Sequence, residues 1–334
     1  MLVSRQLKLV QRPSGLFQAD NFTLAEETLT ELADGEILVK VIYLSLDPTQ
    51  RVWAQMDSYL PAVKLGTVMR SFGLGVVVES RAEGFEKGDL VSGLTGWQTY
   101  LVAEARQLQK IPRVPDLPLD AYLGPLGMTG LTAYFGLLDV GTPKAGETLV
   151  VSAAAGAVGS MVCQMGKLKG LRVIGTTGTE AKCQWLQDEL GVDQVINYKE
   201  QNVYRALRKA APEGIDIFFD NVGGEMLDTV LTQINIGARI PLCGYISAYA
   251  ANEVPGIKNL SVLISKRAKI QGFLVSDYYP RAAEAFTEMA GWLKAGKLHY
   301  RSDIYEGLET APDVINKLFT GENTGKLLIK LADA

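Results

Sequence analysis

The stretch Leu149-Val-Val-Ser-Ala-Ala-Ala-Gly-Ala-Val-Gly-Ser160 joins a short apolar run, typical of a strand, to a turn of small residues. A helix is expected to begin at about Ala157. Gly156 and Gly159 are spaced like the last two glycines of a dinucleotide-binding turn, and Ala154 stands at the position of the first. Such a turn lets a pyrophosphate approach the unpaired N–H groups and the positive dipole end of the helix. A glycine at 159 also lets helix and strand pack closely.

Taken alone, this pattern also fits a tight strand-to-helix turn in any α/β protein. A second strand-like run, Leu171-Arg-Val-Ile-Gly175, follows at the distance expected of a nucleotide-binding unit. The residues after it, up to Thr179, include no Asp or Glu of the kind that binds the ribose 2′-hydroxyl of NAD. Lys182 follows in the next predicted helix, and Glu180 at its start is of a type that stabilises helices. A cation and several hydroxyls favour NADP(H) over NAD(H), although Lys182 also fits an ordinary solvated lysine.

Composition narrows the class of protein. The chain has 334 residues, of which 47% are hydrophobic and 21% charged, with a net charge of −4, so it is long enough for one elaborate domain or two. Without a long basic run, nucleic acid is not an expected partner. The first residues lack the apolar region of a secretory signal, and no apolar run reaches about 20 residues, so no membrane partner is expected. Three widely spaced cysteines predict a reduced, cytoplasmic chain.

The residues also bear on metal and nucleophile chemistry. His299 is the only histidine, and the three cysteines are scattered, so a structural or catalytic zinc site is not expected. A catalytic triad with histidine would have to use His299 as well. Its context, Gly296-Lys-Leu-His-Tyr300, resembles a helix leading into a strand and favours a surface or boundary histidine.

The chain changes character along its length. Residues 1–122 read as β-rich and suggest a small twisted barrel, with predicted strands at 35–46 and 73–80 and a turn followed by a strand at 84–92. A proline-rich joint, Pro112 to Pro118, marks a boundary. A helical stretch at 119–138, broken by Gly127 and Gly130, comes next.

Beyond Pro143, strand and helix patterns alternate. Six strands separated by crossover helices predict an α/β fold with a doubly wound parallel sheet. They are expected near residues 149–153, 171–175, 194–197, 215–219, 237–243 and 269–274. The end of the chain returns to strand-like segments at 300–305 and 325–330, with a helix at 309–319 between them. We therefore predict one domain of residues 1–122 and 299–334, and a nucleotide-binding domain of residues 123–298 inserted into it.

Several segments together resemble one known family. They are Leu44 to Arg51, Gly127 to Leu137, Asn197-Tyr198-Lys199, Phe219 to Gly224, Cys243 to Tyr249 and Glu322 to Lys326, in addition to the glycine turn. With them, nearly the whole chain resembles the zinc-independent medium-chain dehydrogenases/reductases. The similar branch is that of prostaglandin reductase (leukotriene B4 12-hydroxydehydrogenase) and 2-alkenal reductase. The resemblance implies a Rossmann domain inserted in a GroES-like catalytic domain. It also implies a homodimer joined edge to edge near Ala268 to Val275.

The resemblance implies a set of residues that contact NADP(H). Gly156 to Gly159 would hold the pyrophosphate, and Lys182 and Tyr198 would bind the 2′-phosphate. Asn221 would approach the cofactor from the end of the fourth strand, and Asn323 from the tail. The full set is Gly156, Ala157, Val158, Gly159, Thr177, Lys182, Tyr198, Asn221, Cys243, Gly244, Ile246, Ser247, Tyr249, Phe273, Leu274, Val275 and Asn323, of which 243–249 and 273–275 would line the nicotinamide side.

Each of these roles has a purely structural alternative. Tyr198 would also fit a packed aromatic residue at a strand end, and Asn221 a cap of the turn before two glycines. Cys243 fits a buried small hydrophobic residue better than a nucleophile, because no partner base is visible. Phe273 would also fit the core, and Asn323 a turn residue before a glycine.

Some residues depart from the family pattern. Thr49 and Gln50 stand where relatives usually have Tyr and Met, Thr129 stands where Pro is common, and Tyr245 replaces a small or polar residue. Because the resemblance places these positions on or near the substrate pocket, substrate preference cannot be carried over. Arg51, with Tyr245 and Tyr249, is a candidate substrate contact, although a structural ion pair is an equal alternative for Arg51.

The resemblance implies NADPH-dependent reduction of the activated C=C bond of an α,β-unsaturated aldehyde or ketone. Hydride would reach the β-carbon, and negative charge would grow on the carbonyl oxygen. Tyr249 is the candidate hydroxyl donor to that oxygen, together with the cofactor ribose. The alternative is that Tyr249 only lines the pocket. Two other functions stay open: an NADPH quinone reductase, and an NADPH-binding protein without catalysis.

Overall fold

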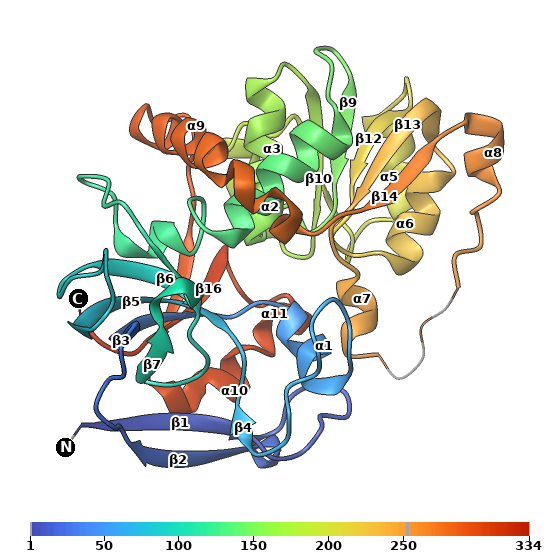
Figure 1. Ribbon diagram of the computed structural model, residues 1–334. Coiled ribbons are helices and arrows are strands. Elements are labelled where there is room, and N and C mark those ends of the chain that lie inside the picture. The colour runs from blue at the N-terminus through green and yellow to red at the C-terminus, as the bar shows by residue number, and fades with distance from the viewer. Residues whose placement is uncertain (1, 252–253, 255, 334) are drawn as a thin grey trace. The chain divides into compact units, whose positions relative to one another are not determined.

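The computed structural model describes residues 2–251, 254 and 256–333, and the chain divides into two compact units. Unit 1 holds the residues up to Leu123, Ser302–Asn323 and the residues from Leu327 onward. Unit 2 holds Gly124–Arg301 and Thr324–Lys326. Figure 1 shows the elements of both.

Unit 2 is built on a six-stranded sheet in which every neighbouring pair of strands runs parallel. The strand order is β11-β10-β9-β12-β13-β14, the order of a doubly wound dinucleotide-binding fold. The bounds are β9 (Thr148–Val151), β10 (Arg172–Thr177), β11 (Gln194–Asn197), β12 (Ile215–Phe219), β13 (Ile234–Leu242) and β14 (Lys269–Gly272). The predicted α/β fold class is therefore confirmed, and each predicted strand overlaps an observed one.

The central strand β9 is buried at all four positions, which explains why its sequence is apolar rather than alternating. Helices connect the strands (Figure 1). They are α2 (Met128–Phe135), α3 (Ala157–Leu168), α4 (Glu180–Gln184), α5 (Val203–Ala210), α6 (Gly224–Leu231), α7 (Ile246–Tyr249), α8 (Val262–Lys266) and α9 (Ala282–Lys294). Wider helical turns follow two of them, at Gly136–Gly141 and Trp185–Glu189.

One predicted break in the helical stretch is wrong. Gly127 does stand before the first turn of α2, but Gly130 lies inside the helix. A Cβ atom at Gly130 would come within 1.7 Å of the carbonyl oxygen of Pro125. Gly130 is thus explained by close backbone packing rather than by helix termination.

Unit 1 contains a three-stranded and a seven-stranded sheet. The first has the order β2 (Phe22–Thr28), β1 (Val3–Leu9), β4 (Thr67–Val68). The second has the order β15 (Ser302–Glu306), β16 (Lys326–Lys330), β3 (Glu36–Ser45), β5 (Phe72–Ser80), β6 (Leu90–Leu94), β8 (Leu108–Lys110), and β7 (Tyr100–Glu104) also pairs with β3. Strands from both ends of the chain therefore share one sheet.

The helices of unit 1 are short: α1 (Thr49–Gln55), α10 (Ala311–Val314) and α11 (Lys317–Thr320). The single helix predicted at 309–319 is thus interrupted. Asn316, between α10 and α11, accepts the amide of Phe17 at 3.0 Å and donates to the Phe17 carbonyl at 2.9 Å. This tertiary contact uses side-chain groups, and a helix prediction from sequence periodicity does not include it.

Within the residues that the structure describes, no helix is long and apolar enough to cross a membrane.

Candidate functional site

The glycine turn of unit 2 is held on both sides by its own backbone. The Ala154 amide donates to the Thr176 carbonyl of β10 at 3.0 Å, and the Gly156 amide donates to the Ala153 carbonyl at 3.0 Å. Ala153 takes a left-handed conformation with φ 48°, which is unusual for a residue with a side chain. Gly156 then caps α3, which begins at Ala157 as predicted. Backbone hydrogen bonds within unit 2 therefore hold the turn.

The small residues of this turn fit against each other without spare room. A Cβ atom on Gly159 would lie 2.3 Å from the Ala153 carbonyl oxygen, so only glycine allows α3 to approach the turn this closely. A Cβ atom on Gly175 would lie 2.8 Å from the Cβ of Ala154. Glycine on β10 therefore provides the space for the alanine that replaces the first glycine of the pattern, a compensation that the sequence analysis missed.

This geometry fits the pyrophosphate of a dinucleotide. The amides of Ala157, Val158 and Gly159 belong to the first turn of α3, where no earlier helical carbonyl can accept their hydrogen bonds. The positive end of the twelve-residue helix lies at the same place. The turn stands at the carboxyl end of β9, the central strand, where open parallel sheets bind their ligands.

A segment from the end of the chain also meets this turn. Gly325 forms a parallel bridge with Gly156, and both belong to unit 2. Gly325 has φ 73°, and a Cβ there would lie 2.0 Å from the Arg301 carbonyl oxygen. Asn323 belongs to unit 1, so its predicted contact with the cofactor stays a prediction.

The predicted 2′-phosphate site lies at the carboxyl ends of β10 and β11. Thr177, which is buried, pairs with Asn197 in the parallel ladder, and the Tyr198 amide donates to the Thr177 carbonyl at 3.0 Å. A Cβ on Gly178 would lie 2.8 Å from the Tyr198 hydroxyl, so the Tyr198 side chain lies against Gly178. Thr179 caps the helix α4 that carries Lys182. The roles of Lys182 and Tyr198 toward a phosphate stay predictions.

Asn221 is positioned by two residues that the sequence analysis did not single out. The Asn221 backbone N–H donates to Ser152 Oγ at 2.8 Å, and the side-chain Nδ2 of Asn221 donates to the Ser152 carbonyl at 2.7 Å. Ser152 Oγ in turn donates to Asp220 Oδ1 at 2.8 Å. Both follow the adjacent strands β9 and β12 directly, and this position in the pattern is the signal that could have found them.

Asp220 is fully buried and binds the loop that follows it. Its carboxylate accepts the amides of Val222 and Gly223 at 2.9 and 3.0 Å, in addition to the Ser152 hydroxyl. Burial nevertheless raises the pKa of Asp220 above its ordinary value. The Asp220 carboxylate therefore orders the turn on which Asn221 stands.

Cys243 and Gly244 follow β13 and are tied to the same place, since both amides donate to the Asp220 carbonyl, at 2.9 and 3.2 Å. Burial, and then the charge of Asp220, raise the pKa of the Cys243 thiol to about 12. A thiol with such a pKa stays protonated at neutral pH and is a poor nucleophile. This agrees with the interpretation of Cys243 as a small packed residue.

The segment after Gly244 forms a short helix, α7, against the Asn221 loop. The Tyr245 amide donates to the Tyr249 hydroxyl at 3.0 Å. Ser247 donates from its amide and from its hydroxyl to the Val222 carbonyl, at 3.2 and 2.6 Å, and the Ile246 amide reaches the Asn221 carbonyl at 3.4 Å. The structure thus brings 243–249 and Asn221 together, and their contact with the cofactor stays a prediction.

The ring of Tyr245 lies directly over Gly223, where a Cβ atom would come within 1.4 Å of its Cδ2. Gly223 also has φ 71°, so a side chain is excluded there on both counts. Part of the Tyr245 ring therefore packs against Gly223, and that part is not available to contact a substrate.

Phe273, Leu274 and Val275 follow β14. The Phe273 ring packs edge-on against Phe219 at a centroid distance of 6.3 Å, and a Cβ on Gly136 would lie 2.4 Å from Phe273 Cζ. Phe273 thus has a packing role, as the alternative interpretation stated, while Leu274 is exposed to 36%. Their contact with nicotinamide stays a prediction.

Arg51 belongs to unit 1, in α1, and its guanidinium is engaged by the fold. Its side chain donates to the carbonyls of Gly15 and Pro13 at 2.7 and 3.1 Å, and the residue is only 5% exposed. These partners are carbonyls, so the expected alternative of an ion pair is replaced by structural hydrogen bonds. Nearby Thr49 shares a hydrogen bond with Tyr59 at 2.8 Å, and Gln50 is fully buried.

His299 is tied into unit 2 through its backbone. Its amide donates to Gln164 Oε1 at 2.7 Å, and its carbonyl accepts from Gln164 Nε2 at 2.9 Å. Across residues 2–251, 254 and 256–333, no three His, Cys, Asp or Glu side chains are grouped so that they could hold a metal ion.

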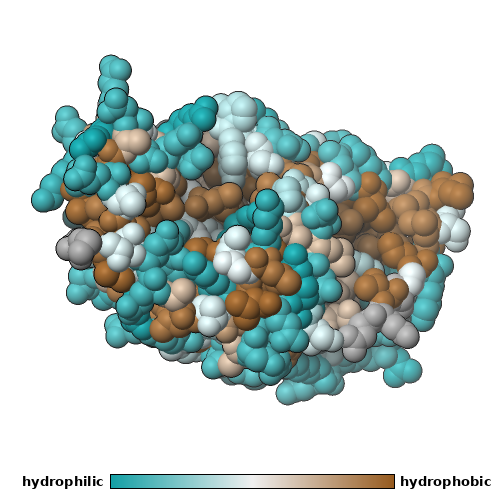
Figure 2. All heavy atoms as spheres, turned by 60° about the horizontal axis from the view of Figure 1, so that its bottom comes forward, coloured by the Kyte–Doolittle hydropathy of each residue, from teal (hydrophilic) through white to brown (hydrophobic). Residues whose placement is uncertain are grey.

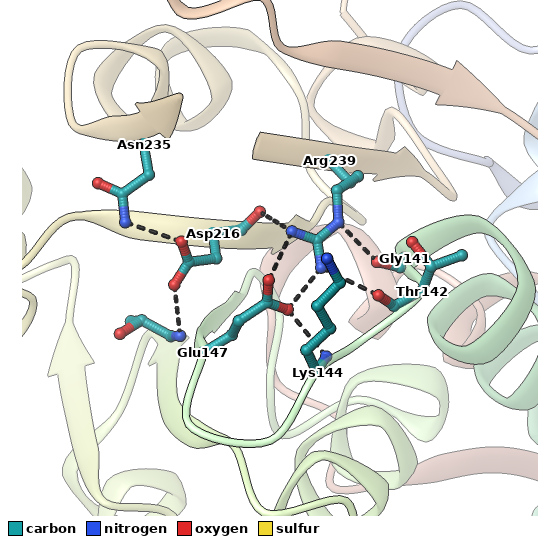
Figure 3. A network of polar contacts seen from close by, with 8 residues as sticks. Gly141, Thr142, Lys144, Glu147, Asp216, Asn235 and Arg239 are labelled. Atoms are coloured by element: carbon teal, nitrogen blue, oxygen red, sulfur yellow. Dashed lines mark hydrogen bonds and ion pairs between the residues drawn. The ribbon is translucent and has the colours of Figure 1, made fainter. Parts of the chain in front are cut away.

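A network of polar contacts lies toward the amino ends of the unit 2 strands, away from the glycine turn at their carboxyl ends (Figure 3). Arg239 of β13 donates to Glu147 at 3.0 Å and to the carbonyls of Gly141 and Thr142, each at 3.0 Å. Asp216 accepts from Asn235 at 2.8 Å. Because Glu147 precedes β9 and Asp216 is the second residue of β12, the network fastens the amino ends of the strands.

Known protein families match segments of both units of the chain. Residues 5–111 match a family described as the N-terminal domain of oxidoreductase, and residues 157–295 match one described as zinc-binding dehydrogenase. The chain is 43% identical to an NADPH-dependent curcumin reductase of Escherichia coli (strain K12), over 98% of this chain and 97% of the relative. It is 42% identical to a 2-alkenal reductase (NADP(+)-dependent) of Nicotiana tabacum, over 89% and 88%. The crystal structure of CurA from Vibrio vulnificus with NADPH shares 44% identity and a TM-score of 0.94, over 99% of this chain and all of that one.

Proposed function

Since this chain belongs to the zinc-independent medium-chain dehydrogenases/reductases and is an NADP(H)-dependent oxidoreductase acting on C=C bonds, we propose that its substrates are α,β-unsaturated aldehydes or ketones. Bound NADPH supplies a hydride to the β-carbon of the activated double bond. The chain has to hold the cofactor, exclude water and stabilise the negative charge that develops on the carbonyl oxygen.

The observation that carries the proposal is the placement of the Tyr249 hydroxyl. It accepts the Tyr245 amide at 3.0 Å, and a Cβ on neighbouring Gly244 would lie 3.7 Å from it. A hydroxyl that accepts an amide hydrogen bond becomes a stronger donor through its own O–H. We assign Tyr249 as the donor to the enolate oxygen, assisted by the ribose hydroxyl of the cofactor, and water as the source of the proton for the α-carbon.

The proposal keeps the predicted cofactor contacts. Gly156 to Gly159 hold the pyrophosphate, Lys182 and Tyr198 the 2′-phosphate, and Asn221, with the segments 243–249 and 273–275, the nicotinamide side. Asn323 is retained as a contact from the tail, and Tyr245 as a residue of the substrate pocket. Arg51 is not retained, because the carbonyls of Pro13 and Gly15 already use its guanidinium.

The first experiment mixes the purified protein with NADPH and a panel of alkenals, alkenones and quinones, with NADH in parallel, and follows loss of the NADPH absorbance band. Fast oxidation with enals and enones and slow oxidation with NADH is the expected result. Turnover of quinones alone would replace the proposal with a quinone reductase. Tight NADPH binding with no oxidation across the panel would contradict catalysis on these substrates.

Replacing Tyr249 with Phe tests the assigned donor. We expect kcat to fall about 100-fold, the scale seen for loss of one oxyanion donor, with the Kd for NADPH within twofold of the original. Tyr204→Phe is the matched control, because the Tyr204 side chain is 49% exposed and lies on α5. Unchanged turnover in Tyr249→Phe would remove Tyr249 from the mechanism and leave it as a residue of the pocket wall.

We also propose that the protein forms a homodimer through the β14 side of unit 2. β14 ends the order of the described strands of the parallel sheet, and sheet edges readily pair with another chain. Apolar side chains gather at the end of the molecule that carries α8 (Figures 1 and 2). Among them are Leu260, 50% exposed, and Ile264, 82% exposed. Exposed apolar side chains on and just before the helix that precedes β14 in sequence, together with an edge of β14 that no other described strand covers, support an interface. A cytoplasmic location remains part of the proposal.

A further inference from the structure

We propose that Lys199 is a further determinant of NADPH specificity, which places a second cation beside the 2′-phosphate of the cofactor. The inference rests on the cofactor site proposed above. Lys199 directly follows Tyr198 in the segment Asn197-Tyr198-Lys199.

The geometry around Gly178 points to Lys199. A Cβ built on Gly178 would lie 2.8 Å from the Tyr198 hydroxyl and 3.2 Å from Lys199 Cε. The aliphatic end of Lys199 and the Tyr198 hydroxyl therefore meet at the same glycine, directly after β10. In a parallel dinucleotide-binding sheet, the 2′ position of the adenosine ribose is read at this strand end.

The backbone of Lys199 is also held in place. Its amide donates to Asn197 Oδ1 at 3.2 Å, and the neighbouring Tyr198 amide donates to the Thr177 carbonyl at 3.0 Å. Asn197 itself is 4% exposed and ends β11. The turn thus fixes the direction in which the chain leaves β11, while the Lys199 side chain itself remains exposed and makes no ion pair with the described residues.

The local charge explains why one lysine is not enough. Glu180 and Glu200 flank the site in sequence, and both act on Cys183, whose pKa is raised by burial and then by these two carboxylates. A phosphate monoester carries a charge of about −1.5 to −2 near neutral pH. Lys182 alone would face this charge together with two carboxylates. With Lys199, the two cations balance the two glutamates, and the neighbouring hydroxyls can then bind the phosphate without a net repulsive field.

Calorimetry on the full chain tests the inference with two probes, adenosine 2′,5′-bisphosphate and adenosine 5′-monophosphate, which differ only at the 2′ position. For Lys199→Gln we expect the Kd of the bisphosphate to rise about five- to tenfold, as for loss of a charge-assisted contact, and that of the monophosphate to stay within twofold. The affinity of Lys199→Gln for the bisphosphate should also depend less on salt. Lys199→Arg keeps the charge and should keep the affinity.

Lys209→Gln is the matched control, because it removes the same charge from an exposed lysine of the same unit. Lys209 lies near the end of α5. The carbonyl of the next residue, Ala210, accepts from Arg172 at the start of β10, so Lys209 is near the amino end of that strand and the proposed phosphate site is at its carboxyl end. A bisphosphate Kd within twofold of the original in Lys199→Gln would overturn the inference while the cofactor site stands. Equal binding of both probes by the unchanged protein would overturn the proposed 2′-phosphate site as well.

Discussion

At the scale of single residues, the dinucleotide turn is defined by which positions tolerate a side chain. Gly159 does not, because its Cβ would lie 2.3 Å from the Ala153 carbonyl oxygen. Ala154 does, because Gly175 on the next strand leaves room for its methyl group. The pattern of small residues is therefore a property of two strands and a helix together, and a motif confined to one loop describes only part of it.

Gly159→Ala should damage both stability and cofactor binding. The added methyl group has to push the first turn of α3 away from Ala153, at a cost of about 1–3 kcal/mol, the usual range for overpacking. The same displacement moves the amides that face the pyrophosphate, so the Kd for NADPH should rise as well. Thermal unfolding and a fluorescence titration with NADPH measure the two effects.

The control for this substitution is Gly291→Ala in α9. Apart from the neighbouring backbone of its own helix, no atom of the described residues lies within 4 Å of the Cβ position of Gly291. Alanine there should stabilise the protein slightly, by about 0.5–1 kcal/mol, because it has a higher helix propensity than glycine. Equal effects of the two substitutions would contradict the packing role of Gly159.

The sequence predicted the positions of the turn residues but not how they are supported. Gly156, Gly159 and the helix start at Ala157 follow from spacing, because a strand, a tight turn and a helix have fixed lengths. The contacts of Ser152 and Asp220 with Asn221 depend on β9 and β12 being neighbours, which no local pattern states. The carbonyl partners of Arg51 are equally invisible in sequence, because Pro13 and Gly15 are far from it along the chain.

At the scale of elements, all six strands of the parallel sheet could be predicted, most clearly β9 and β12, whose sequences are nearly all apolar. The short helices were harder. Gly130 was predicted to break α2 but instead lets it pack against Pro125, and Asn316 interrupts the helix expected at 309–319 by bonding to Phe17. In both cases a packing or hydrogen-bonding contact decided what helix propensity alone could not, a local contact at Gly130 and a long-range one at Asn316.

The network of Figure 3 gives a prediction at this scale. Hydrogen bonds from Arg239 and from the Lys144 amide lower the pKa of Glu147 overall, although burial, the largest single effect, acts in the opposite direction. A carboxyl group whose pKa is lowered by folding stabilises the folded state above its unfolded pKa and loses that effect as pH falls. Glu147→Gln should therefore cost about 1–2 kcal/mol at neutral pH, and the difference from the original protein should shrink in acid.

Thermal unfolding of both proteins over a pH series measures this difference. Glu104→Gln is the matched control, because Glu104 pairs with Arg106 on the surface of unit 1, where the side chains are 49% and 84% exposed. This control should unfold like the original protein at every pH. A difference for Glu147→Gln that persists unchanged into acid would show that the shape of the side chain matters there, and not its charge.

At the scale of the whole molecule, the proposed dimer gives the remaining prediction. Sedimentation velocity at micromolar concentration should report twice the mass of one chain. Ile264→Glu places a charge on the exposed apolar surface of α8 and should shift the equilibrium toward monomers. Tyr204→Glu, at a position on α5 that is 49% exposed, is the control. A monomer at all concentrations would contradict the proposed interface and leave the catalytic proposal untouched.

The order of strands in unit 1 has a consequence for how the protein is made. β3 pairs with β16 through Tyr43, Leu44 and Ser45 opposite Lys330, Ile329 and Leu328, nearly 300 residues later along the chain. A ribosome that has made the first half of the protein therefore exposes a strand edge whose partner has not yet been synthesised. Unit 2 is almost continuous and can complete its sheet earlier. Nascent chains halted before residue 326 should thus need chaperones, which bind exposed strand edges and keep them from pairing between neighbouring chains.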